Sequence, residues 1–203
     1  MPSVTLPVTA DNYQVNSSNW YTSDGGTGLY AGVTGDGDVY RILLGFSAAT
    51  GYANVKVDSA TLKVYRKDTY SDKTWAVRVV SFDGSDSTTV DSNVVTVTLD
   101  TGIGWKSINI ASLMPALMVS AGRRLLLYSG GSGNTYAEIR PLEYSSGSYA
   151  AQIDMTYTYP LKVRVSGTWR NVNVNNMRVR VAGTWRKIKT IKVRVAGTWR
   201  KVF

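Results

Sequence analysis

The stretch "ATLKVYRK" (60–67) alternates apolar and polar residues. This period of two is typical of a β-strand with one buried face. The same alternation, rich in β-branched and aromatic residues, returns in "WAVRVVSF" (75–82), "NVVTVTLD" (93–100), "RRLLLYS" (123–129) and "AQIDMTYTY" (151–159). Turn-forming Gly, Asp and Ser separate the runs, as in "SDGGTG" (23–28), "TGDGD" (34–38), "FDGSDS" (82–87) and "SGGSGN" (129–134). Many short strands with such turns predict an all-β fold, an antiparallel jelly-roll sandwich.

One helix is expected in this sandwich. In "IASLMPALMVSAG" (110–122), Leu113, Leu117 and Met118 recur at helical spacing until Gly122. Proline is tolerated in the first turn of a helix but not deeper, so Pro115 limits the segment to one short helix or helical turn between two strands.

The charge is divided unevenly along the chain. The 203 residues carry a net charge of +9, yet residues 1–160 hold 11 Lys and Arg against 14 Asp and Glu, whereas residues 161–203 hold 12 against none. Such asymmetry is typical of two modules with different partners. We therefore expect a sandwich over 1–160 and a separate basic module over 161–203.

The composition argues against catalysis. The chain has no Cys and no His, so disulfides, the commonest metal ligand and the usual general base near neutral pH are all missing. We expect no enzymatic activity, no cofactor and no metal. The opening "MPSVTLPVTADNY" lacks the basic and apolar regions of a signal peptide, and no apolar run is long enough to span a bilayer. We expect a soluble product of the cytoplasm without membrane insertion.

Six segments occur in this order along the chain: "VTADNYQV" (8–15), "YRILLGFSAAT" (40–50), "VDSATLKVYRKD" (57–68), "GWKSINIASLM" (104–114), "LLLYSGGSGNTYAEIRPLEY" (125–144) and "AAQIDMTYTY" (150–159). In this order they resemble the DNRLRE family of β-sandwich carbohydrate-binding modules, over roughly residues 4–159. The resemblance implies a jelly roll that binds polysaccharide. The chain departs from the family pattern at "YAEIRPLEY" (136–144), which weakens any transfer of a ligand site to Glu138.

Sugar recognition needs flat aromatic faces and polar side chains, commonly in loops. Candidate carbohydrate-binding residues are therefore the aromatic residues beside Gly, Asp and Ser turns: Trp20, Tyr21, Tyr30, Tyr70 and Trp75. Aromatic residues inside alternating strands are expected in the core instead, because large rings dominate sandwich packing; these are Tyr40, Phe46, Tyr65, Phe82 and Trp105.

Two acidic clusters, Asp36 with Asp38 and Asp83 with Asp86, have two interpretations. They could supply calcium ligands or a catalytic pair, but no EF-hand spacing is present and sequence places no two acids across a cleft. Asp-Gly is more simply a turn signal.

The last 43 residues repeat one phrase three times: "LKVRVSGTWRNVNVNN" (161–176), "MRVRVAGTWRKIKT" (177–190) and "IKVRVAGTWRKVF" (191–203). Each copy predicts a β-hairpin. A two-residue loop at Ser166-Gly167 would place Arg164 opposite Trp169, with Arg stacked on Trp for about 0.5–1 kcal/mol. A three-residue loop would place Val165 there instead, and the sequence leaves both registers open.

A lone hairpin of this size is marginal in water, so the repeats need cover from each other, a second copy or a partner. We expect assembly contacts through the valines, through Trp169, Trp185 and Trp199, and through Arg164, Arg180 and Arg194. The repeats resemble the V-x-G-x-W hairpin repeats that end many bacteriophage minor tail and fibre-like proteins. That resemblance implies a virion protein, of the tail-fibre, minor-tail or capsid-decorating type.

The expected function is thus a phage adhesin, in which the sandwich binds a host surface polysaccharide and the repeats form a homotrimer or dock on other virion proteins. Two alternatives remain open. Basic residues interleaved with tryptophan can bind nucleic acid or an anionic cell-wall polymer, although no phosphate-cradling loop or base-reading motif is present. A polysaccharide-active enzyme is the second alternative, and the missing histidine and unpaired acids argue against it.

Overall fold

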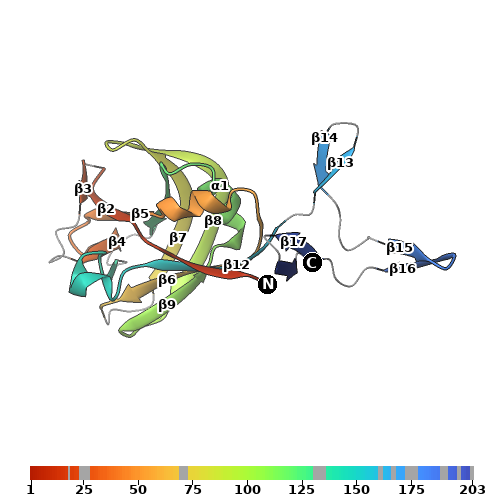
Figure 1. Cartoon of the computed structure of the whole chain (residues 1–203). Coiled ribbons are helices and arrows are strands. Elements are labelled where there is room, and N and C mark those ends of the chain that lie inside the picture. Colours follow the sequence, from red (N-terminus) through yellow and green to blue (C-terminus); the bar gives the residue numbers. More distant parts are fainter. Residues whose placement is uncertain are drawn as a thin grey trace.

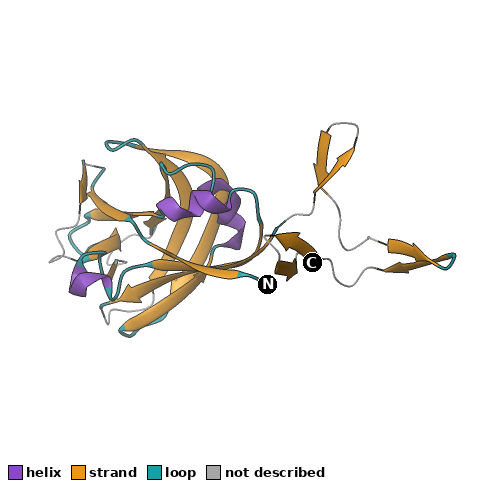
Figure 2. Cartoon of the chain, viewed as in Figure 1, coloured by secondary structure: helices purple, strands orange, loops and turns teal. Residues whose placement is uncertain are grey.

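The computed structural model describes residues 1–17, 19–22, 28–68, 73–129 and 136–159, and within the repeats residues 162–165, 168–171, 178–187, 192–195 and 198–201. Strands dominate this part of the chain, and the helices are short (Figure 2). The prediction of an all-β sandwich is confirmed. No helix among the described residues is long and apolar enough to cross a membrane.

Twelve strands form the sandwich, and all of their pairings are antiparallel (Figure 1). One layer contains β1 (Ser3–Pro7), β6 (Lys56–Arg66), β9 (Gly104–Asn109), β11 (Ala137–Ile139) and β12 (Gln152–Thr158). The other contains β2 (Ala10–Val15), β3 (Trp20–Thr22), β5 (Val39–Gly45), β7 (Lys73–Phe82), β8 (Ser87–Leu99) and β10 (Arg123–Tyr128). Strand β4 (Leu29–Val33) pairs with β11 and with β5 and so joins the layers.

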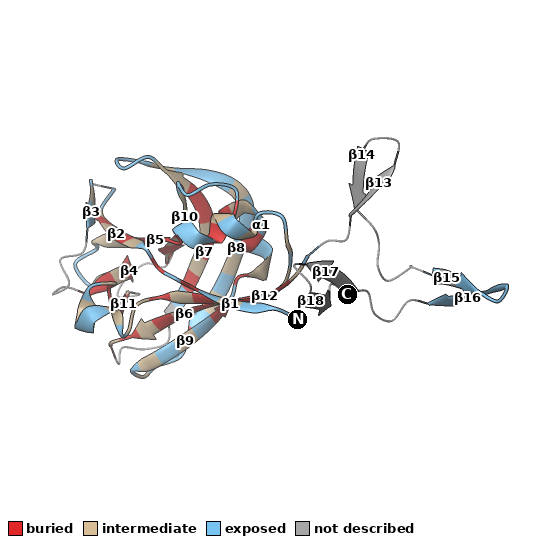
Figure 3. Ribbon diagram, viewed as in Figure 1, coloured by how far each residue is buried: buried red, intermediate tan, exposed pale blue. Residues whose placement is uncertain are grey.

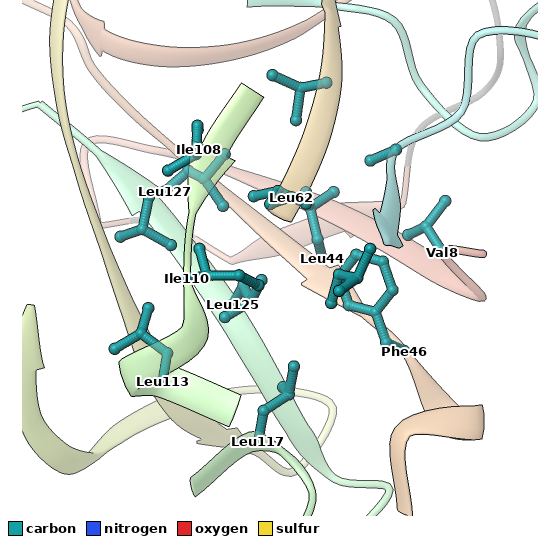
Figure 4. Close-up of a cluster of buried hydrophobic side chains, with 14 of the residues drawn as sticks. Val8, Leu44, Phe46, Leu62, Ile108, Ile110, Leu113, Leu117, Leu125 and Leu127 are labelled. Atoms are coloured by element: carbon teal, nitrogen blue, oxygen red, sulfur yellow. The ribbon is translucent and has the colours of Figure 1, made fainter. Parts of the chain in front are cut away.

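The order of the strands gives the jelly-roll topology. From β5 onward the chain crosses repeatedly between the layers, because β6, β9, β11 and β12 lie in one layer and β5, β7, β8 and β10 in the other. Side chains on the inner faces of both layers form one core, drawn in part in Figure 4, to which β5 and β10 contribute Leu44 and Leu125 and to which β6 and β9 contribute Leu62 and Ile108. Figure 3 shows these buried stripes along the strands.

The expected helix is present and short. Residues 111–113 form the 3-10 turn η2 (Ala111–Leu113), which leads into α1 (Met114–Leu117), and Pro115 lies in the first turn of α1 as its missing N–H requires. Leu113, Leu117 and Met118 are buried against the sandwich. Two further 3-10 segments are η1 (Ser47–Tyr52) and η3 (Tyr144–Gly147).

A buried ion pair closes one edge of the core. Arg66 is fully buried at the end of β6, and its Nη2 lies 2.7 Å from Oδ1 of Asp68. Its Nη1 donates to the carbonyls of Leu99 and Asp100. The other carboxylate oxygen of Asp68 accepts the backbone N–H of Glu138. The network therefore ties β6, β8 and β11 together.

Each repeat is a separate two-stranded sheet, and among the described residues none of its strands joins the sandwich sheet. The pairs are β13 (Lys162–Val165) with β14 (Thr168–Asn171), β15 (Arg178–Val181) with β16 (Thr184–Lys187), and β17 (Lys192–Val195) with β18 (Thr198–Lys201). Figure 1 shows them outside the sandwich. Independent folding of residues 1–160 stays a prediction.

The structure decides the hairpin register. Arg164 pairs with Trp169, Arg180 with Trp185 and Arg194 with Trp199, which is the two-residue-loop alternative. In the middle hairpin both loop residues have positive φ, 49° at Ala182 and 83° at Gly183. This is the backbone that a type I′ turn requires.

Candidate functional site

Trp75, one of the five aromatic residues expected to bind sugar, is fully buried. It shares the inward face of β7 with Val77 and Val79, both core residues. A ring without exposed surface cannot stack on a ligand, so the expectation for Trp75 was wrong. Its role is packing.

Of the other four candidates, the three that the structure describes, Trp20, Tyr21 and Tyr30, make separate aromatic contacts. Trp20 is half-buried, with its ring edge-on to Phe82 at 5.9 Å between centroids. Tyr21 is 45% exposed and lies 5.4 Å from the Tyr13 ring. Tyr30 is half-buried and contacts the rings of two other tyrosines, Tyr40 and Tyr136. Tyr70 lies outside the described residues.

A different set of aromatic residues gathers on the outer face of the β6–β9 pair. Trp105 on β9 lies directly opposite Tyr65 on β6, and the two rings meet edge-on at 5.5 Å and 90°. The ring centroid of Tyr149 lies 4.4 Å from that of Tyr65, and the ring centroid of Tyr144 lies 5.9 Å from that of Tyr149. We call Trp105, Tyr65, Tyr149 and Tyr144 the aromatic platform.

The platform is open to ligand because its first ring is exposed. Trp105 is 44% exposed, which contradicts the expectation that it belongs to the core, while Phe46 is buried as expected. At the other end the guanidinium of Arg140 lies 3.7 Å from the centroid of the Tyr144 ring. This cation–π contact stabilises the position of Tyr144, the ring of the platform that η3 contributes.

A polar row continues from the platform on the same face. Lys63 is two residues before Tyr65 on β6, so both side chains point outward. Its Nζ lies 2.6 Å from Oδ2 of Asp154 on β12. Oδ1 of Asp154 accepts from Thr5 at 2.7 Å and Gln152 at 3.4 Å. The bonds from Lys63 and Thr5 hold the pKa of Asp154 below its ordinary value, so the carboxylate is ionised and oriented.

The alternation of residues along each strand, rather than closeness to a loop, was the sequence signal that could have identified the platform. In "GWKSINI" (104–110), Trp105 has the same parity as Ser107 and Asn109, whereas Ile108 and Ile110 have the other. The ring therefore had to face away from the core. In "WAVRV" (75–79), Trp75 instead has the parity of Val77 and Val79.

The acidic clusters have turn roles. Oδ1 of Asp83 accepts the backbone N–H groups of Ser85 and Asp86, across a turn in which Gly84 has a φ of 105°. These bonds lower the pKa of Asp83. Oδ1 of Asp38 accepts from Asn16 at 2.6 Å. The described residues contain no group of three His, Cys, Asp or Glu side chains placed to hold a metal ion.

Glu138 is a partner in a structural contact. Its side chain is buried on β11, and its Oε1 accepts from Nζ of Lys67. The carboxylate also occupies the space where a Cβ at Gly28 would lie. Any larger residue at position 28 would displace this carboxylate.

The middle repeat leaves its apolar side chains uncovered. Trp185 is 62% exposed and Val181 46% exposed, and every described side chain of 180–187 is exposed (Figure 3). The expected Arg–Trp stacking is absent in this hairpin, since no guanidinium lies over the Trp185 ring in its described contacts. Instead Nε of Arg180 donates to the Gly183 carbonyl at 3.3 Å. The side chains of Arg164, Trp169, Arg194 and Trp199 lie outside the described residues.

Comparisons with known proteins add little to this geometry. No protein-family model matches the chain, and no curated protein matches it. Among solved structures, one described as Eiger TNF from S. frugiperda is similar to 74% of this chain and 92% of its own, at 12% identity and a TM-score of 0.27. A likeness at this level carries no functional argument.

Proposed function

We propose that the sandwich is a carbohydrate-binding module whose ligand lies along the aromatic platform and the polar row beside it. The observation that carries this proposal is Trp105, a large aromatic side chain that is 44% exposed on the outer face of strand β9. Its neighbour Tyr65 braces it edge-on, which fixes the ring without covering it.

The combination of groups fits a sugar chain. A pyranose has an apolar face that packs on a flat ring and a rim of hydroxyls that need donors and acceptors. Lys63 offers donors, Asp154 acceptors and Gln152 both, and these three lie beside the platform on adjacent strands. The side chains of Lys63 and Asp154 are each about one-third exposed, and their ion pair already holds them in place. Little side-chain conformational entropy is therefore lost when a ligand binds them.

Trp105→Ala tests the proposal. A glycan array with the full chain identifies a ligand, and titration of the variant should then show binding weakened by about 10-fold or more, since the loss of a central aromatic contact costs at least about 1.4 kcal/mol. The melting temperature should change little because the ring is on the surface.

Tyr21→Ala is the matched control, because Tyr21 is as exposed as Trp105 and lies on the other layer. It should bind normally. If Tyr21→Ala lost binding while Trp105→Ala kept it, the ligand would lie at the β3 position that the sequence alone favours, and the platform proposal would be wrong.

The repeats support the second half of the proposed function, an assembly element in a bacteriophage virion. Trp185 and Val181 remain exposed in the single chain, and a trimer or another virion protein would bury them. A nucleic acid could stack a base on the Trp185 ring but would leave Val181 in water. The phage assignment itself depends on the resemblance of the three repeats to tail and fibre hairpins, and the mass of the full chain in solution tests the trimer.

A further inference from the structure

The second layer has a charged hollow on its outer face. On β5 and β10, Ile42, Leu44, Leu125 and Leu127 point into the core, so the residues between them point out. Arg41 on β5 and Arg78 on β7 thereby line a hollow of about 220 Å³, with Val80 and Leu126 as its apolar lining.

The polar groups that line this hollow are mainly donors. Besides the two guanidinium groups, the hydroxyls of Ser87 and Thr89 on β8 and of Tyr128 on β10 line it. Nη1 of Arg41 reaches Gln14 at 3.3 Å, and Arg78 bonds to the Tyr128 hydroxyl and, at 3.4 Å, to Thr89. The guanidinium of Arg78 also lies 4.5 Å from the Tyr128 ring centroid. These contacts position the two arginines without neutralising them.

None of the described residues that line the hollow is an Asp or a Glu. All five of their ion pairs involve other cations: Lys56, Lys63, Arg66, Lys67 and Lys106. Nε of Arg78 is buried without a hydrogen-bond partner, as is Nε of the neighbouring Arg124. Burial also lowers the pKa of Arg124. Half-buried guanidinium groups with unused donors are costly unless an anion completes them.

The arrangement of the donors indicates the kind of anion. They reach the hollow from four strands, β5, β7, β8 and β10, and therefore from several directions. A carboxylate offers two acceptor oxygens in one plane, whereas a phosphate or sulfate ester offers three around a tetrahedron. The arginine fork binds such oxyanions with paired hydrogen bonds.

We propose that this hollow binds a phosphate or sulfate ester group carried on a glycan, as a second ligand site separate from the aromatic platform. A single ester fits better than a nucleic acid, because residues 1–160 have an excess of acids and a polyanion needs a track of cations. The site does not depend on the platform, since it lies on the other layer.

Titration calorimetry of the full chain tests the site, with glucose 6-phosphate, glucose 6-sulfate and glucuronate as probes at one ionic strength. At least one ester should bind saturably and glucuronate at least about 10-fold more weakly. The tighter ester identifies the source of the anion. Equal binding of glucuronate, or no binding of either ester, would overturn the proposal.

The variant R41Q/R78Q should lose ester binding. Arg123→Gln is the matched control, because Arg123 has the opposite parity on β10 to Leu126 and Tyr128, which line the hollow. If R41Q/R78Q does not fold, R41K/R78K decides the question. It keeps both charges but loses the forks, so ester binding should weaken on the order of 10-fold. Unchanged affinity in the folded double variant, or displacement of the ester by random duplex DNA, would contradict the assignment.

Discussion

Asp11 offers a quantitative test of how the sandwich is built. Its side chain lies on the inward face of β2 and the residue is only 3% exposed. Oδ2 accepts the backbone N–H of Leu142 at 2.6 Å, while Oδ1 is buried without a partner. Burial raises the pKa of Asp11 to about 6 from 3.8; the bond from Leu142 opposes this shift and the charge of Glu143 adds to it.

The sign of the effect follows from the raised pKa. The folded state holds this proton more tightly than the unfolded state, so the stability that the protonated group contributes is complete below pH 3.8 and is lost as the pH rises through 6. The full shift is worth about 3 kcal/mol, and about 1.4 kcal/mol of it falls between pH 5 and pH 8; water reaching the carboxylate reduces both.

The assay is urea unfolding of the wild type and Asp11→Asn at pH 5 and pH 8. Asparagine keeps the shape and an acceptor for the Leu142 N–H but carries no charge. The stability of the wild type relative to the variant should therefore fall by up to about 1.4 kcal/mol from pH 5 to pH 8. The exposed Asp36→Asn serves as control. Parallel pH profiles of wild type and Asp11→Asn would refute the reasoning.

Four further predictions concern packing and modules. Trp75→Ala should destabilise the sandwich by about 3–5 kcal/mol in urea unfolding, because it opens a cavity in the core. Arg66→Ala should cost a similar amount because it removes the cation that pairs with the buried Asp68 carboxylate, and a loss below about 1 kcal/mol would show that the ion pair is dispensable. A fragment of residues 1–160 should fold and melt cooperatively on its own. Replacing Trp169, Trp185 and Trp199 together with alanine should reduce the full chain to monomers, as measured by light scattering. The melting temperature of the sandwich should not change.

Much of the fold could be predicted from the period of two. Strands β6, β7, β8, β10 and β12 overlap the alternating runs, although β6 and β8 begin several residues earlier, and the helix begins where Pro115 allows it. These features depend on local residue preferences, which the sequence contains. The ion pair of Arg66 with Asp68 was not predicted, although Arg66 has the parity of Leu62 and Val64, because a charged residue at a core position is rare unless it is paired.

The candidate site was harder to predict than the fold. Trp75 was chosen as a sugar-binding candidate because it lies close to a turn. However, a residue near the start of a strand can belong to the core, and Trp75 lies on the inward face of β7. The platform needs residues 65, 105, 144 and 149 to meet, and only the pairing of β6 with β9 and the packing of η3 bring them together. The hairpin register needed the turn geometry as well.

The turn at Ala182-Gly183 has a consequence for how the repeats work. Alanine pays a steric penalty at positive φ that Asn or Gly largely avoids. The other copies carry Ser166-Gly167 and Ala196-Gly197 at the aligned positions, so none uses the preferred Asn-Gly. The middle hairpin is therefore only weakly preorganised, and if the repeats assemble as proposed, part of its ordering accompanies association. Ala182→Asn should therefore tighten association by lowering this conformational cost, without adding any contact.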